Sequence, residues 1–201
     1  TLVDSGVTVF TPNIRGSSGA GRSVLHADDR YGRFAAIDDV ADTARFLVDT
    51  GIGDPARLAL GGRSYGGFLS LLVASRYPDL FRCIVDACGM TSFESYYGST
   101  EPWLAAAAYP KYGYPFQDAE LLRQVSPLNR AADIVTPVLF IHGSEDNFVY
   151  TDMVYDLYDA CRTPKDLLVV EGAGHGESYA MDPALYFDTV FGFIEGNCIP
   201  N

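Results

Sequence analysis

The chain has 201 residues, of which 48% are hydrophobic and 20% are charged, a composition that suits a folded domain and excludes a wholly disordered chain. Its 14 basic and 26 acidic residues give a net charge of -12, which repels nucleic-acid phosphates and anionic lipid surfaces. No apolar run approaches the roughly 20 residues that a membrane span needs. We therefore expect neither a nucleic-acid partner nor a membrane partner.

Short apolar segments alternate with longer segments of helical period, which is typical of a parallel sheet flanked by helices. In chain order, the sequence predicts the end of a helix at 1–6, a strand at 7–11, an amphipathic helix at 37–48, a strand at 57–60, a helix at 66–77, a strand at 83–87, a strand at 138–142, a helix at 152–161, a strand at 166–170 and a helix at 183–196. Residues 91–133 interrupt this alternation, because aromatic residues, prolines and glycines gather there. We interpret them as an excursion over the sheet, and we predict one α/β domain.

The four cysteines, Cys83, Cys88, Cys161 and Cys198, form no C-x-x-C pair and have no histidine at metal-ligand spacing. The sequence therefore indicates neither a zinc site nor a redox motif. We interpret these residues as buried free thiols, although one or two disulfides would leave no signature. Free thiols are typical of a reducing compartment, and this favours a cytoplasmic location.

The strongest local signal is a predicted strand followed by Gly62-Arg-Ser64-Tyr-Gly66 and then by a predicted helix. This order is typical of a nucleophile elbow, in which a serine occupies a strained turn between strand and helix. We expect glycine to be needed at both Gly62 and Gly66, because a side chain there would collide with neighbouring backbone. The N-terminus of the helix would favour the negative charge that develops beside the serine.

A serine needs a base to accept its proton, and three histidines compete for that role. His175 lies in a glycine-rich loop just after the last predicted strand, where catalytic groups gather in parallel sheets, and we predict that it is the base. His142 ends a strand and is expected to hold a loop in place. His26 lies in a polar segment beside Asp28 and is interpreted as a solvated side chain.

The acid that orients the base is expected in the loop after the strand at 138–142, which offers Asp146 and, as the alternative, Glu145. With Asp146, the order along the chain is Ser64, Asp146, His175. This is the order of nucleophile, acid and base in α/β-hydrolases.

Five segments together resemble the catalytic domain of the prolyl oligopeptidase family, and among its members the acylaminoacyl and dipeptidyl peptidases. They are NIRGSSGAG at 13–21, GGRSYGG at 61–67, SYY at 95–97, HGSED at 142–146 and GHG at 174–176. The resemblance implies an α/β-hydrolase fold, a mostly parallel sheet with helices on both faces. It also implies a serine peptidase that cleaves short peptides or aminoacyl compounds through an acyl-enzyme, with no metal or organic cofactor.

Carried over by motif position, Ser64, Asp146 and His175 match the family's catalytic triad. The backbone N–H of Tyr65 matches an oxyanion donor, Tyr65 and Val149 match positions that line the pocket for the residue before the cleaved bond, and Arg15 matches an arginine near the substrate cleft. The alternative for Arg15 is an ordinary salt bridge.

Aromatic residues of the excursion are candidates for the same pocket, because they should lie above the site. They are Phe93, Tyr96, Tyr97 and Trp103. The alternative is that they pack the small core of the domain.

The sequence departs from the family pattern at its start. Members usually carry an N-terminal β-propeller, and residues 1–201 contain nothing of it. The strand predicted at 7–11 matches the fourth strand of the α/β-hydrolase scheme. The third strand, which should lie between the fourth and the fifth, precedes a loop that gives the second oxyanion donor. We therefore expect residues 1–201 to be the C-terminal part of the catalytic domain, strands four to eight, and an upstream polypeptide segment to supply the missing strands and donor.

Two other functions use the same residues. One is an esterase or amidase that acts on a small metabolite, since the same chemistry serves both. The other is a catalytically silent interaction domain, which an incomplete oxyanion site would favour.

Overall fold

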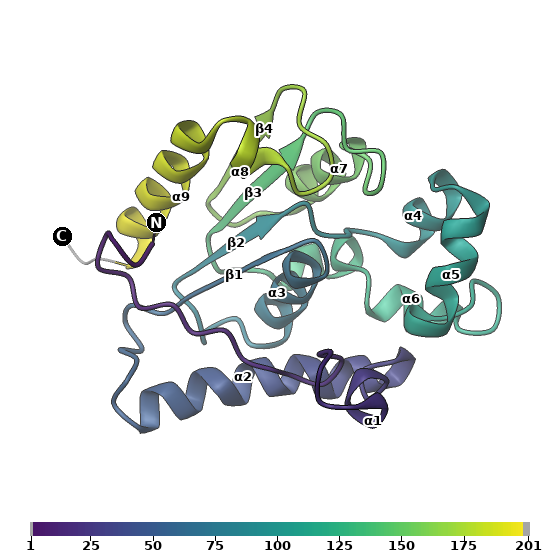
Figure 1. Ribbon diagram of the computed structural model, residues 1–201, viewed down its shortest axis with the longest axis horizontal. Helices are drawn as coiled ribbons and strands as arrows, with labels where there is room; N and C mark the ends of the chain where they lie inside the picture. Colours follow the sequence, from purple (N-terminus) through teal and green to yellow (C-terminus); the bar gives the residue numbers. More distant parts are fainter. Residues whose placement is uncertain (1, 199–201) are drawn as a thin grey trace.

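The computed structural model describes residues 2–198, and these residues form one four-stranded sheet (Figure 1). The strands are β1 (Ala59–Arg63), β2 (Cys83–Ala87), β3 (Val138–Gly143) and β4 (Lys165–Val170), and they lie side by side in that order. All three pairs are parallel, so the carboxyl ends of the strands share one edge of the sheet. This confirms the predicted α/β class.

Helices cover both faces of the sheet (Figure 1). They are α1 (Arg22–Leu25), α2 (Arg33–Asp49), α3 (Tyr65–Arg76), α4 (Phe93–Ser99), α5 (Pro102–Tyr112), α6 (Ala119–Gln124), α7 (Asp152–Ala160), α8 (Ser178–Met181) and α9 (Pro183–Cys198), with 3₁₀ helices at Arg30–Gly32 and Pro127–Asp133. On one face, Phe193 of α9 belongs to a buried cluster with Val85 and Leu139. On the other face, Phe68 of α3 belongs to a cluster with Phe140 and with apolar residues of α2 and α7.

The excursion at 91–133 folds into the helical lobe, defined here as α4, α5 and α6, which lies beyond the carboxyl ends of the strands (Figure 1). Aromatic contacts attach the lobe to α3. The ring of Phe68 in α3 packs edge-on against Phe93 of α4 at a centroid distance of 5.5 Å and against Tyr112 of α5 at 6.1 Å. Such pairs stabilise by about 0.5–1.5 kcal/mol beyond their buried area, so the lobe is part of the domain and not a linker.

The N-terminal segment differs from the prediction. Residues 2–6 form hydrogen-bonded turns instead of the end of a helix, and residues 7–11 form no strand; position 1 lies outside the described residues. A strand needs a neighbour with which to exchange backbone hydrogen bonds. Here a cavity of about 400 Å³, lined by Val7, Phe10, Leu58 and Leu60 among others, separates the segment from β1.

The other predicted elements are present, with shifted ends. The strand predicted at 57–60 is β1, which begins two residues later and continues to Arg63 because Gly61, Gly62 and Arg63 all pair with β2. The last helix continues to Cys198. The four cysteines are free and buried, as predicted. None of the helices within residues 2–198 has the length and the apolar surface that crossing a membrane requires.

Candidate active site

The turn between β1 and α3 holds Ser64 in a strained conformation. Its φ of 54° and ψ of -114° belong to a region that residues with a Cβ atom rarely adopt. A Cβ atom on Gly62 would lie 2.2 Å from the carbonyl carbon of Gly66, so glycine is needed at 62. The same expectation for Gly66 is wrong, because a Cβ atom there would meet nothing within 4 Å.

Backbone contacts fix this turn against the end of β2. The amide of Ser64 donates to the carbonyl oxygen of Ala87 at 2.7 Å. A Cβ atom on Gly67 would lie 2.1 Å from the buried carboxylate of Asp86, so the first turn of α3 rests directly on β2. The position of the serine hydroxyl is therefore set by the sheet itself.

Three side chains from loops after three different strands meet at the carboxyl edge of the sheet. Nε2 of His175 lies 2.8 Å from Oγ of Ser64, and Nδ1 of His175 lies 2.8 Å from Oδ2 of Asp146. A carboxylate only accepts hydrogen bonds, so Nδ1 donates. In the neutral imidazole, Nε2 is then the acceptor that faces the serine hydroxyl.

The loop after β3 holds Asp146 in a fixed orientation. Its Oδ1 accepts hydrogen bonds from the amides of Phe148 and Val149, each at 2.9 Å. His142 donates from Nε2 to the carbonyl oxygen of Val149 at 2.8 Å, which confirms its loop-holding role. Glu145, the alternative acid, points to solvent.

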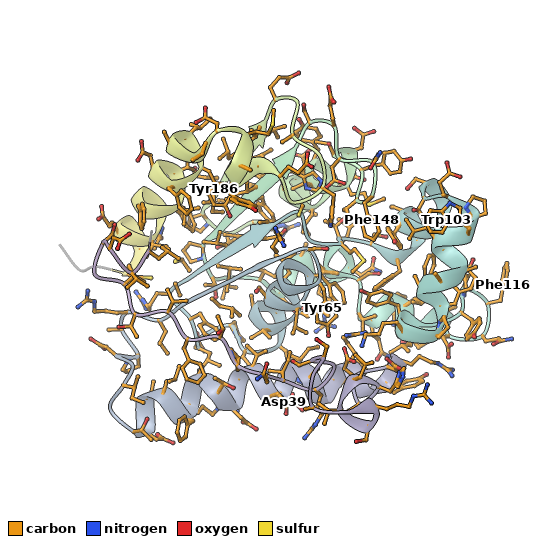
Figure 2. All side chains as sticks on the ribbon, viewed as in Figure 1. Asp39, Tyr65, Trp103, Phe116, Phe148 and Tyr186 are labelled. Atoms are coloured by element: carbon orange, nitrogen blue, oxygen red, sulfur yellow. The ribbon has the colours of Figure 1, made fainter. Side chains whose placement is uncertain are left out.

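The loops after β3 and β4 pack closely against each other. A Cβ atom on Gly143 would lie 2.2 Å from the carbonyl oxygen of Ala173, so only glycine fits at the end of β3. The ring of Phe148, which lies between the strands and the helical lobe in Figure 2, packs on the imidazole of His175 at a centroid distance of 4.7 Å. These contacts restrict the imidazole to the gap between Ser64 and Asp146. Neither the close approach at Gly143 nor the ring contact of Phe148 was predicted from the sequence.

The surroundings shift the pKa values of Asp146 and His175 in opposite directions. Burial raises the pKa of Asp146, but the contacts from His142 and His175 and the amide of Val149 lower it more, so its pKa lies well below the usual range. Burial lowers the pKa of His175, but Asp146 and the neighbouring Cys88 outweigh it and raise that pKa to about 9. Asp146 is therefore an anion at neutral pH, and it stabilises a charged imidazole.

Tyr65 is the first residue of α3, and a buried polar cluster holds its side chain. Its hydroxyl donates to Oδ2 of Asp28 at 2.6 Å, and the guanidinium of Arg33 lies 4.8 Å from the centre of its ring. Asp28 also accepts from Arg33 and Lys111. Burial raises the pKa of Asp28, but these partners lower it more. This cluster could not be predicted from residue patterns, because its members lie in a polar segment or far apart along the chain.

The remaining candidates lie at different depths. Phe93 and Tyr96 are fully buried in the aromatic contacts of the lobe. The half-buried Tyr97 donates from its hydroxyl to the carbonyl oxygen of Gly113 at 3.1 Å. Trp103 is 70% exposed on α5, at the surface of the lobe (Figure 2). The structure therefore packs the first three into the core and leaves Trp103 outside it.

Two candidates outside the lobe have structural partners. Val149 is fully buried and acts through its backbone, which holds Asp146 and His142. Arg15 forms an ion pair with Asp39 of α2, with its Nη2 at 3.5 Å from Oδ1. This ion pair is the alternative that the sequence left open for Arg15.

Comparisons with known proteins agree on one family. A family model described as the prolyl oligopeptidase family matches residues 1–198. Dipeptidyl aminopeptidase BIII of Pseudoxanthomonas mexicana is 29% identical over 183 residues, which cover 87% of this chain and 27% of that protein. The acylamino-acid-releasing enzyme of Homo sapiens is 29% identical over 192 residues, covering 88% of this chain and 25% of that protein.

A solved structure of a puromycin-hydrolyzing peptidase from Mycobacterium tuberculosis superposes with a TM-score of 0.87 and 26% identity, covering 94% of this chain and 29% of that one. This confirms the α/β-hydrolase fold. The chain spans about a quarter of the length of the curated relatives it matches.

The imidazole of His175 is expected to titrate with a pKa of about 9, because its charged form is stabilised by Asp146. In an Asp146→Asn variant that pKa should fall toward the ordinary histidine value of about 6.5. NMR of the His175 ring nitrogens as a function of pH measures this pKa in the unmodified protein and in the variant. Glu145→Gln, which removes the neighbouring exposed carboxylate, should leave the pKa near that of the unmodified protein; an equal fall in both variants would contradict the assignment of Asp146.

Replacing Arg33, whose side chain is 1% exposed, with Met should lower the free energy of unfolding by about 3–5 kcal/mol, because it removes a partner of a buried carboxylate. Arg15→Met, which breaks the exposed pair with Asp39, should change it by about 1 kcal/mol or less. Denaturant unfolding of both variants measures the difference. Similar losses in the two variants would show that the Asp28 cluster is not a buried charge network.

Proposed function

Because this chain belongs to the prolyl oligopeptidase family, we propose that it carries the catalytic centre of a serine peptidase. The enzyme cleaves peptide or amide bonds in short peptides or aminoacyl compounds through an acyl-enzyme. The observation that carries the proposal is the chain of two 2.8 Å contacts from Ser64 through His175 to Asp146. In this proposal the three residues are nucleophile, base and acid.

The proposed reaction begins when Ser64 Oγ attacks the substrate carbonyl and its proton passes to Nε2 of His175. Asp146 stabilises the charged imidazole through Nδ1, and the backbone N–H of Tyr65, at the N-terminus of α3, donates to the oxyanion. His175 then gives the proton to the leaving amine, and the acyl group stays on Ser64. Water repeats the sequence, with His175 as base, and releases the acid product.

The charge state of His175 gives the direction of the pH dependence. The imidazole must lose its proton before Nε2 can accept one from Ser64. Because its pKa is raised to about 9, the rate of acylation should increase as the pH rises through that value.

Peptide or amide substrates are favoured over simple esters because two of the relatives named above are a dipeptidyl aminopeptidase and a puromycin-hydrolyzing peptidase. The net charge of -12 favours neutral or cationic substrates. The free thiols support a reducing, cytoplasmic location. Aminoacyl, N-acylaminoacyl and prolyl amides, assayed beside simple esters, separate the alternatives: turnover of esters alone would favour the esterase.

The nucleophile is tested with a fluorophosphonate probe, which reacts with an activated serine. The protein should be labelled at Ser64, and Ser64→Ala should abolish labelling, because no other serine hydroxyl within residues 2–198 is hydrogen-bonded to His175. Ser75→Ala is the matched control, since it removes a hydroxyl from the far end of α3, and it should label normally. Labelling that persists in Ser64→Ala would refute the proposed nucleophile.

We also propose that a polypeptide segment upstream of residue 1 adds a strand beside β1 and brings the second oxyanion donor. Within residues 2–198, β1 is an edge strand, and the cavity of about 400 Å³ lies along it. Val9 and Phe10, in the segment that borders this cavity, leave about half of their side chains exposed. An added strand would cover this apolar surface and satisfy the free edge of β1.

The proposed strand is tested by comparing residues 1–201 expressed alone with the natural polypeptide that contains them. The isolated chain should hydrolyse an aminoacyl amide at least about 100-fold more slowly, because losing one oxyanion donor typically costs about 100–1000-fold. Adding the upstream segment in trans should restore part of the rate. Equal rates for the two proteins would overturn this proposal while leaving the nucleophile assignment intact.

A further inference from the structure

Cys88 lies beside the proposed catalytic residues, although the spacing of cysteines and histidines along the chain predicts no metal site. Cys88 follows β2, Asp146 follows β3 and His175 follows β4, so three adjacent strands each deliver one potential ligand to the same edge of the sheet. One ligand atom from each residue, a thiol sulfur, a carboxylate oxygen and an imidazole nitrogen, lies within 4.8 Å of the other two.

The backbone fixes the position of this thiol. Cys88 has a φ of 48°, a conformation that is unfavourable for a residue with a Cβ atom. Its amide donates to the carbonyl oxygen of Ile141 at 2.8 Å, and the amide of Gly89 donates to Oδ1 of Asp86 at 3.0 Å. The side chain is 2% exposed. No step of the proposed hydrolysis forms or breaks a bond to this thiol.

We propose that Cys88, His175 and Asp146 form an inhibitory site for a thiophilic divalent cation, of which Zn²⁺ is the representative. The inhibition rests on the proposed function, whereas the binding does not. Thiolate, imidazole and carboxylate are the three ligand types that Zn²⁺ takes in proteins, at about 2.3, 2.0 and 2.1 Å. Two such ligand atoms lie about 3.5 Å apart around one ion, so the observed cluster needs a closure of about 1 Å, within reach of side-chain rotation.

Coordination would disable the catalytic arrangement whichever ring nitrogen binds the ion. Binding through Nδ1 replaces the proton that His175 shares with Asp146, and binding through Nε2 replaces the contact with Ser64. The thiol proton leaves to solvent, and water completes the fourth position. The side chain of His175 is 24% exposed, so an ion from solvent meets the imidazole first.

The ligand types also determine which ions act. Mg²⁺ and Ca²⁺ prefer oxygen ligands alone, so they should not inhibit at concentrations where Zn²⁺ does. Cys83 begins β2 and Cys198 ends α9, so this pair lies at the opposite end of β2 from Cys88, with its sulfur atoms 3.4 Å apart. This thiol pair can bind a soft ion without contacting His175, and Cys83→Ala is therefore the matched control.

The site is tested first by inhibition of the natural full-length polypeptide, in metal-free buffer and with added Zn²⁺, each variant being compared with its own metal-free rate. Zn²⁺ should inhibit, a chelator should restore the rate, and Mg²⁺ should have no effect. Cys88→Ala should raise the inhibitory Zn²⁺ concentration at least about tenfold, since even outer-sphere changes cost about 10–100-fold in metal affinity. Cys83→Ala should leave it unchanged.

Cobalt provides a readout that does not depend on hydrolysis. Co²⁺ bound to the site should give a thiolate-to-cobalt charge-transfer absorption that is lost in Cys88→Ala and in His175→Ala but kept in Cys83→Ala. An absorption that depends on Cys83 instead, or Zn²⁺ inhibition that Cys88→Ala leaves unchanged, would overturn the proposal. If the Cys88-dependent absorption appears in a protein that hydrolyses none of the amides or esters, the site stands and the proposed function fails.

Discussion

The parallel pairing of the four strands is the constraint on which the site depends. Because β1 to β4 all run in the same direction, residues that follow their carboxyl ends meet at one edge of the sheet. Ser64, Cys88, Asp146 and His175 each follow a different strand. No two of them are neighbours in sequence, and the sheet alone brings them within reach of one another.

The edge of the sheet tolerates this convergence because its buried carboxylates have hydrogen-bond partners and because glycine occupies positions of close approach. Asp146 is buried, yet it accepts bonds from two amides and from His175, and this offsets the cost of burying its charge. Asp28 is satisfied in the same way beneath Tyr65. Gly62, Gly89 and Gly143 occupy places at this edge where a Cβ atom would strike backbone.

Local patterns predicted most of the fold and the three residues of the proposed catalytic centre, because the elbow at Ser64 and the loops after the strands have strong sequence signals. The features that depend on partners far away in the sequence were not predicted. Residues 7–11 alternate like a strand but have no neighbouring strand within the described residues. Cys88 lies near His175, and Arg33 is buried against Asp28. Both contacts depend on the tertiary structure, and the polarity of each residue taken alone does not reveal them.

The contact between residues 64 and 175 is the central claim, and a crystal structure of the natural polypeptide after reaction with a fluorophosphonate tests it most directly. The account predicts a covalent bond from phosphorus to Oγ of Ser64. It also predicts that His175 lies within hydrogen-bonding distance of the adduct while Nδ1 remains on Asp146. A phosphonate on another residue, or an imidazole of His175 turned away from both Ser64 and Asp146, would contradict it.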